Sequence, residues 1–222
     1  HRMINMENIQ NKNYQRELDL FLSRLETTPS LLLHSCCAPC SSYVLLYLSD
    51  YFKITVFYFN PNIAPQEEYQ KRLLEQKKFI KKIAVKNPVD FIEGDYDHSE
   101  FLEIARGLES EPEFGKRCHA CYGLRLNETA RLAKEMGFDF FTTTLSVSPH
   151  KNAAKINEIG LNAAKLFGAD FLCADFKKKN GYKRSVELSK EYNLYRQDYC
   201  GCEFSKRKEI SNELNQACQN CL

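Results

Sequence analysis

Five short apolar runs are spaced along the chain, and each is followed by a longer segment in which apolar residues recur at helical spacing. Most of the runs contain β-branched or aromatic residues, and all are short enough to be strands buried on both faces of a sheet. The predicted strands cover residues 31–34, 54–59, 89–92, 138–144 and 171–173.

Helices are predicted between these strands. A segment at 7–26 carries apolar residues at helical spacing ahead of the first strand, and Gly168 ends the helix predicted over 152–167. The other predicted helices cover residues 41–48, 66–82, 101–107, 121–137 and 185–192. Alternation of this kind predicts an α/β domain in which a parallel sheet of about five strands is flanked by helices.

The pattern divides the chain into three parts. Residues 1–30 hold an N-terminal helix, preceded by His1 and Arg2, which are typical of the remnant of an expression tag. Residues 31–205 form the α/β domain and carry every candidate metal-binding and catalytic residue, and residues 206–222 form a C-terminal tail.

The most unusual residues follow the carboxyl ends of predicted strands, which is where open parallel sheets bind their ligands. The first strand ends in HSCCAPC (34–40), and the fourth ends in TTTLSVSP (142–149). We therefore expect the functional site at this edge of the sheet.

Composition narrows the class of protein. The chain has 222 residues, of which 43% are hydrophobic and 27% charged, and this excludes wholesale disorder. Its net charge of +2 does not by itself predict a nucleic-acid partner. No apolar run approaches the roughly 18 residues that a membrane helix needs, so we expect no membrane partner. No export signal is visible, and we expect a cytoplasmic protein.

Ten cysteines are present, and all but Cys173 lie in close clusters. A chain of this length needs no disulfide framework, so the clusters favour metal or redox chemistry. The clusters are Cys36, Cys37 and Cys40; Cys118 and Cys121; Cys200 and Cys202; and Cys218 and Cys221. Cys173 lies in an apolar run and is typical of a buried hydrophobic residue. We assign no catalytic role to the terminal pair.

The first cluster has two interpretations. Cys37 and Cys40 form a CxxC pair of the kind found in thiol–disulfide active sites. Alternatively, the adjacent Cys36 and Cys37 can each face a metal, and Cys40 lies near a helix N-terminus, where the helix dipole favours a thiolate. A single redox pair does not account for the other clusters, so we favour metal binding.

Cys118 and Cys121 form a second CxxC pair, and two such pairs are typical of a structural zinc site with four ligands. Cys200 and Cys202 bring the number of thiols in the three groups to seven, more than one tetrahedral ion can use. This surplus favours an iron–sulfur cluster over zinc.

Positive charges and tyrosines alternate over residues 177–199. This combination fits phosphate contact and base stacking on single-stranded RNA, although a run of charges is also typical of a solvated face. The candidate substrate-binding residues are Tyr182, Arg184, Tyr195 and Arg196.

Four motifs, taken in order, resemble the epoxyqueuosine reductases of the QueH type. They are HSCCAPCS, RCHACYGLRL, FTTTLSVSPHKN and the stretch ADFKKKNGYKRSVELSKEYNLYRQDYCGC. The resemblance covers residues 31–205. It implies a nucleotide α-hydrolase-like (HUP-like) three-layer fold that uses metal where relatives use ATP.

The resemblance also implies an activity and its cofactors. The activity is reduction of epoxyqueuosine to queuosine at the wobble base of tRNA anticodons. It implies a [4Fe-4S] cluster with an adjacent mononuclear iron, an external electron donor and no cobalamin. The residues that match the family's metal-binding cysteines are Cys36, Cys37, Cys118, Cys121, Cys200 and Cys202.

Catalytic roles follow as hypotheses. Some members have an acidic residue where this chain has Cys40, so Cys40 either replaces an oxygen ligand or stays unliganded. We expect Cys37 and Cys40 to lie at the reacting centre, and Asp97 and His98, after the third strand, to supply protons.

Two alternative functions use the same fold or the same thiols. The first is a zinc-stabilised tRNA-binding protein, and the second is a tRNA thiolation enzyme that uses ATP. The thiolation enzyme requires a glycine-rich pyrophosphate loop after the first strand, and HSCCAPCS lacks those glycines.

Overall fold

A four-stranded parallel sheet forms the centre of the computed structural model, which describes residues 12–206. The strand order is β3-β2-β1-β4, so the two central strands are β1 and β2. The strands span β1 Ser30–His34, β2 Lys53–Tyr58, β3 Val89–Glu93 and β4 Phe140–Thr143. The α/β class and the parallel sheet are confirmed, with four strands in place of the five predicted.

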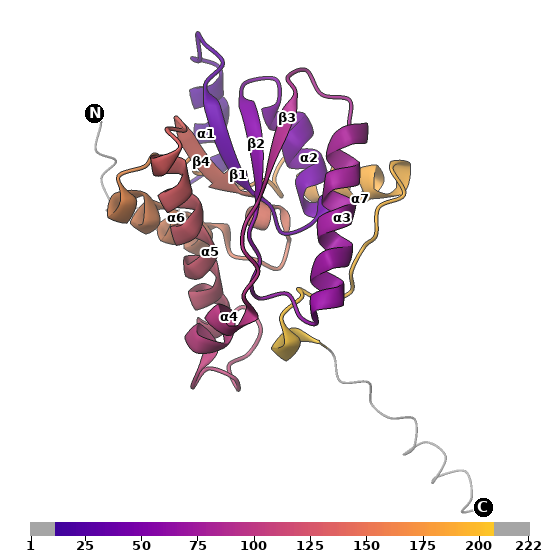
Figure 1. The fold of residues 1–222 in the computed structure, drawn as a ribbon. Helices are drawn as coiled ribbons and strands as arrows, with labels where there is room; N and C mark the ends of the chain where they lie inside the picture. The colour runs from indigo at the N-terminus through magenta and orange to yellow at the C-terminus, as the bar shows by residue number, and fades with distance from the viewer. Residues whose placement is uncertain (1–11, 207–222) are drawn as a thin grey trace, which may run out of the picture.

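The two faces of β1 are covered by different helices, as expected from the three consecutive leucines of this strand. Leu31 and Leu33 belong to one core cluster and Leu32 to another, because successive side chains point to opposite faces. The helices of the domain are α1 Tyr14–Leu22, α2 Ala38–Leu48, α3 Gln66–Lys82, α4 His98–Ala105, α5 Lys116–Glu135, α6 Ala153–Phe167 and α7 Gly181–Glu191. Helices α5 and α6 cover one face, while α2 and α3 cover the other, which gives three layers (Figure 1).

Helix boundaries differ from the predicted ones where capping residues decide them. Helix α2 begins at Ala38, three residues before the predicted start, because Pro39 is well suited to the first helical turn. This extension places Cys40 inside the first turn. Helix α6 ends at Gly168, which is left-handed with φ of 67°, as predicted.

The prediction of a fifth strand over residues 171–173 was wrong. Only Phe171 pairs with the sheet, through a single parallel bridge to Phe141. Three residues later, the buried side chain of Asn157 on α6 bonds both the N–H and the C=O of Ala174, each at 3.0 Å. This amide side chain therefore takes the place of a neighbouring strand and ends the ladder.

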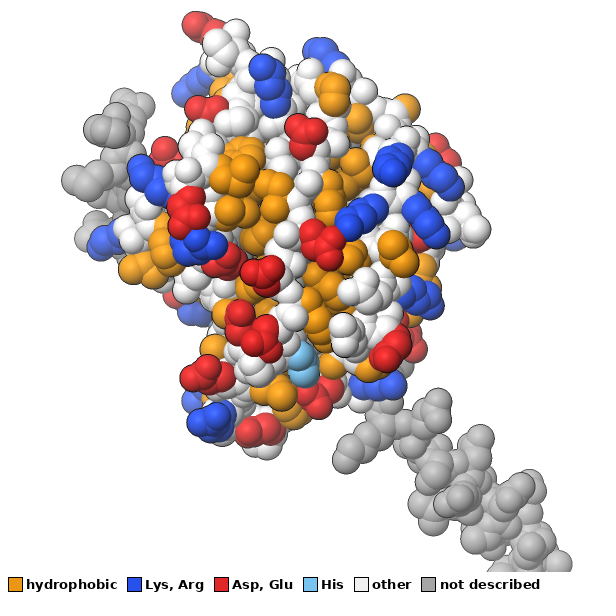
Figure 2. Space-filling view, viewed as in Figure 1, with side chains coloured by type: hydrophobic (Ala, Val, Ile, Leu, Met, Phe, Trp, Pro, Cys, Tyr) orange, Lys and Arg blue, Asp and Glu red, His pale blue; other side chains and the backbone are white. Residues whose placement is uncertain are grey.

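Charged side chains are unevenly distributed on the face shown in Figure 2. Lys and Arg side chains gather over α3, Asp and Glu side chains gather over α4, and hydrophobic side chains lie between the helix layers. Two 3-10 turns, Thr144–Val147 and Glu203–Ser205, complete the described elements. Within residues 12–206, no helix combines the length and the apolar character needed to cross a membrane. Cys218 and Cys221 lie outside the described residues.

Candidate metal centre

The first thiol group lies where β1 meets α2. Cys37 is the N-cap of α2, in extended backbone conformation, and Cys40 follows in the first turn of the helix. The sulfur atoms of Cys36, Cys37 and Cys40 all lie within 4.8 Å of one another. The Sγ atoms of Cys36 and Cys37 are 3.8 Å apart, and neither cysteine is in a disulfide. These three residues, which we name the three-thiol group, could hold a metal ion.

The members of the three-thiol group shift one another's pKa values in opposite directions. Hydrogen bonding with Cys37 and Cys40 holds the pKa of Cys36 well below its usual range, and the charges of Lys151 and Arg125 lower it further. Hydrogen bonding to Cys36 raises the pKa of Cys37 to about 12. Cys37 in turn accepts a hydrogen bond from Nε2 of Gln197 at 3.0 Å. Binding of a cation would release the protons that these thiols carry.

A second thiol group forms where the start of α5 meets the loop after α7. Cys118 and Cys121 lie one turn apart at the start of α5, and a small cavity is lined jointly by them and by Cys200 and Cys202. The N–H of Phe114 donates to Sγ of Cys118 at 3.2 Å. Burial raises the pKa of Cys121 to about 12. We call these four cysteines the four-thiol group.

The loop that carries Cys200 and Cys202 is held by a buried arginine of α3. Arg72 is only 1% exposed, and it donates to the carbonyl oxygens of Cys200 at 3.0 Å and Tyr199 at 3.4 Å. Gly201 is left-handed with φ of 109°, and its Cα faces Arg72 and Ile63 so closely that a Cβ atom would lie 3.0 Å or less from each. Glycine is required here both for the backbone conformation and for the space.

Arg125 lies between the two thiol groups. Its guanidinium group donates to the carbonyl of Cys121 at 3.2 Å and to Oδ1 of Asn60 at 3.4 Å. Its Nη2 is buried and has no partner among the described residues. Burial acts to lower the pKa of Arg125, but the thiols of Cys121, Cys200 and Cys36 outweigh it and raise this pKa. A buried cation with a free donor fits an anionic group bound between the thiols, such as an iron–sulfur cluster.

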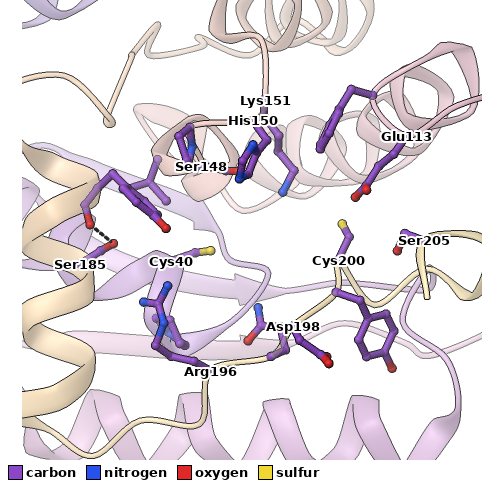
Figure 3. Close-up of a pocket in the computed structure, with 17 residues that line it drawn as sticks. Cys40, Glu113, Ser148, His150, Lys151, Ser185, Arg196, Asp198, Cys200 and Ser205 are labelled. Atoms are coloured by element: carbon purple, nitrogen blue, oxygen red, sulfur yellow. Dashed lines mark hydrogen bonds between the residues drawn. The ribbon is translucent and has the colours of Figure 1, made fainter. Parts of the chain in front are cut away.

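A larger cavity of about 520 Å³ adjoins both thiol groups. Cys40 of the three-thiol group and Cys200 of the four-thiol group line it together (Figure 3). Lys151 also lines it, and although burial acts to lower its pKa, Cys200, Cys36 and Cys40 raise this pKa above its usual range. Further charged and polar lining residues are Glu113, His150, Arg196 and Asp198. A cavity of this size admits one small organic ligand.

Two of the four predicted substrate-binding residues line this cavity, namely Tyr182 and Arg196. The other two do not. Arg184 forms an ion pair with Glu187 on the exposed side of α7, and the hydroxyl of Tyr195 contacts Glu68 at 3.2 Å.

The two predicted proton donors also lie away from the cavity. Asp97 is the N-cap of α4 and accepts a hydrogen bond from the N–H of Ser99 at 2.9 Å. His98 bonds the carbonyl of Pro61 at 2.7 Å and a carboxylate oxygen of Glu203 at 3.0 Å. Neither residue is among those that line the cavity.

Four polar residues of the site were given no role at the level of sequence. Arg72 and Arg125 lie within charged helical segments, where an arginine is normally a surface residue. Gln197 carries no local signal. Lys151 lies within the FTTTLSVSPHKN motif, and its position at that edge of the sheet was the only available signal.

The fold and the site define an α/β protein with two clusters of free thiols, at least one of which could bind a metal, beside a charged cavity. A family model described as "Epoxyqueuosine reductase QueH" matches residues 31–208. The chain is 43% identical to the epoxyqueuosine reductase QueH of Streptococcus pyogenes serotype M1, covering 93% of this chain and 83% of that protein. It is 34% identical to the protein of the same name from Thermotoga maritima, covering 84% of this chain and 96% of that protein. The chain belongs to the QueH family, which confirms the resemblance found in the sequence.

Proposed function

We propose that this protein reduces epoxyqueuosine to queuosine at the wobble position of tRNA anticodons. Family membership supports the activity, and the cavity beside two thiol groups is the single structural observation that carries it. The reaction takes two electrons and two protons: both carbon–oxygen bonds of the epoxide break, an alkene forms, and the oxygen leaves as water. The electrons come from an external donor, and the reaction takes place in the cytoplasm without cobalamin. The family match does not favour the zinc and thiolation alternatives.

The two thiol groups differ in spacing, and we use this difference to assign the metals. A tetrahedral ion with metal–sulfur bonds of about 2.3 Å holds its sulfurs about 3.8 Å apart. Cys36 and Cys37 have this separation, and among the described residues only their group brings three ligand atoms within 4.8 Å of one another. A cluster places iron and sulfide between its thiolates and so holds them farther apart. We therefore assign the [4Fe-4S] cluster to the four-thiol group and the mononuclear iron to the three-thiol group.

The bound metals would supply single electrons and a Lewis acid beside the cavity. The protein's own residues bind and orient the substrate. The ammonium group of Lys151 donates a hydrogen bond to the epoxide oxygen and stabilises the negative charge that develops there as a carbon–oxygen bond breaks. Tyr182 and Arg196 hold the base and its phosphate. Asp97 and His98 have no part in this proposal, because neither residue lines the cavity.

Anaerobic reconstitution followed by iron and sulfide analysis tests the metal assignment. We expect Cys118→Ser to lose most of the iron and the sulfide, and Cys37→Ser to lose iron while it keeps the sulfide. Cys173→Ser is the matched control, because Cys173 is a free cysteine that lines neither cavity. Full iron and sulfide in the Cys118 variant would refute the assignment.

Activity is measured on tRNA that bears the epoxide, with a strong reductant and no added cobalamin. We expect product with the reconstituted wild-type protein, and at least a hundredfold lower turnover for Lys151→Met, from loss of about 3 kcal/mol of charge stabilisation. A wild-type protein that holds zinc but no iron after reconstitution, and forms no queuosine, would refute the proposed function.

A further inference from the structure

Phe114 has two unfavourable properties that folding alone does not explain. Its backbone is left-handed, with φ of 70°, a conformation that is rare for residues other than glycine and rarest for bulky ones. Its aromatic side chain is nevertheless 38% exposed. Strained backbone and exposed apolar surface both cost free energy, and such residues cluster at ligand-binding sites.

The surroundings of Phe114 are those of a binding site. The residue lines the 520 Å³ cavity, and its ring lies nearly parallel to that of His150, with 6.0 Å between the ring centroids and 21° between the planes. Tyr182, also 38% exposed, lines the same cavity. His150 and Lys151 lie on one side of the cavity and Arg196 lies on the other (Figure 3). Exposed aromatic rings beside cationic side chains are the groups that bind single-stranded RNA, through stacked bases and contacted phosphates.

The size of the cavity determines where neighbouring bases must lie. A volume of about 520 Å³ suits one ligand of nucleoside size, so the nucleotides on either side of a bound one stay at the rim. Phe114 lines the cavity and is 38% exposed, which is what a residue at that rim requires. We propose that Phe114 is a base-stacking residue, and that its ring stacks on the anticodon-loop base next to the nucleotide held in the cavity. This inference rests on the proposed function, because it requires an anticodon loop as the ligand.

The backbone of Phe114 has a separate contact, which allows a clean test. Its N–H donates to Cys118, so the same residue positions a thiol of the four-thiol group through its main chain and faces the cavity with its side chain. A Phe114→Leu variant keeps the N–H donor and removes only the aromatic face. We therefore expect unchanged iron and sulfide content and unchanged visible absorption in this variant.

The test is binding of a fluorescently labelled anticodon stem-loop with guanosine at the wobble position, measured by anisotropy with reconstituted protein. We expect Phe114→Leu to raise Kd about tenfold, within the range found when stacking side chains are truncated. Phe114→Tyr should keep Kd within twofold of the wild type, because it keeps the ring. Leu166→Ala is the matched control, since Leu166 is an exposed apolar residue that lines neither cavity, and it should have no effect.

An abasic nucleotide on either side of the wobble position identifies the stacked base. At the stacked position, the abasic RNA should bind wild type and Phe114→Leu equally, because the contact is already lost. Equal Kd values for the two proteins on the intact stem-loop, or losses that add at both abasic positions, would overturn the inference. Failure of the wild type to prefer this stem-loop over one with a scrambled loop would instead contradict the proposed function and, with it, this inference.

Discussion

Replacing Gly201 by alanine should selectively damage the four-thiol group. At a left-handed position, an alanine costs about 1–2 kcal/mol of backbone strain. The new Cβ would lie 2.9 Å from Ile63 and 3.0 Å from Nη1 of Arg72, and such overpacking adds about 1–3 kcal/mol. The total of about 2–5 kcal/mol falls on the loop between Cys200 and Cys202 and opposes the hydrogen bonds from Arg72 that hold it.

Gly107→Ala is the matched control for this experiment. Gly107 is also left-handed, with φ of 78°, but a Cβ there would meet no atom within 4 Å. The free energy of unfolding of this variant should therefore fall only by the cost of the backbone strain. Urea unfolding followed by circular dichroism gives the stability of each variant, and iron and sulfide analysis after anaerobic reconstitution gives its metal content.

We expect Gly201→Ala to lose iron and sulfide and Gly107→Ala to keep both. If the loop detaches locally, the metal content should fall while the free energy of global unfolding changes little. The metal content is therefore the decisive measurement. Equal iron and sulfide in the two variants would refute the reasoning, because it would show that the positions of Cys200 and Cys202 do not depend on close packing at residue 201.

Three further predictions concern stability and are measured by urea unfolding. Burial, followed by the charge of Arg125, lowers the pKa of His34 from 6.5 to about 3. Between these two pH values the unfolded state binds more protons than the folded state, so the free energy of unfolding decreases as the pH is lowered. Acidification of the metal-free protein from pH 7 to pH 5 should cost about 2 kcal/mol through this residue, a component that His34→Gln should lack. Asn157→Ala should cost about 2–4 kcal/mol because it leaves both polar backbone groups of Ala174 buried and unpaired, and a loss below 1 kcal/mol would contradict this. Gly160→Ala should destabilise by about 1–3 kcal/mol despite better helix propensity, because its Cβ would lie 2.3 Å from the ring of Phe171, and Phe171→Leu should rescue it.

The central strands could be predicted because their apolar residues are buried on both faces, and this leaves a continuous run in the sequence. The end of strand pairing after Phe171 could not be predicted. It depends on Asn157 of α6, whose side chain bonds the backbone of Ala174 in place of a neighbouring strand. Competition of this kind depends on tertiary contacts, and neither segment carries a local sign of it.

The thiol clusters could be predicted because cysteine is rare and its spacing is informative. The division of the thiols into a group of three and a group of four could not be predicted, since it depends on the direction from which each loop approaches. Asp97 and His98 follow a strand at the correct edge of the sheet, but β3 is the outermost strand in the order β3-β2-β1-β4. Asp97 and His98 therefore follow an edge strand and do not line the larger cavity, whose lining includes Cys40 after β1 and Lys151 after β4.

The order of the thiols along the chain constrains how the protein is made. Cys118 and Cys121 leave the ribosome before Cys200 and Cys202, since α7 and its flanking loops are synthesised between the two pairs. A nascent chain therefore exposes half of the four-thiol group without its counterpart, during the period when thiols are most open to oxidation and to capture of the wrong ion. Insertion of a cofactor that all four thiols hold must therefore wait until Cys202 has been synthesised.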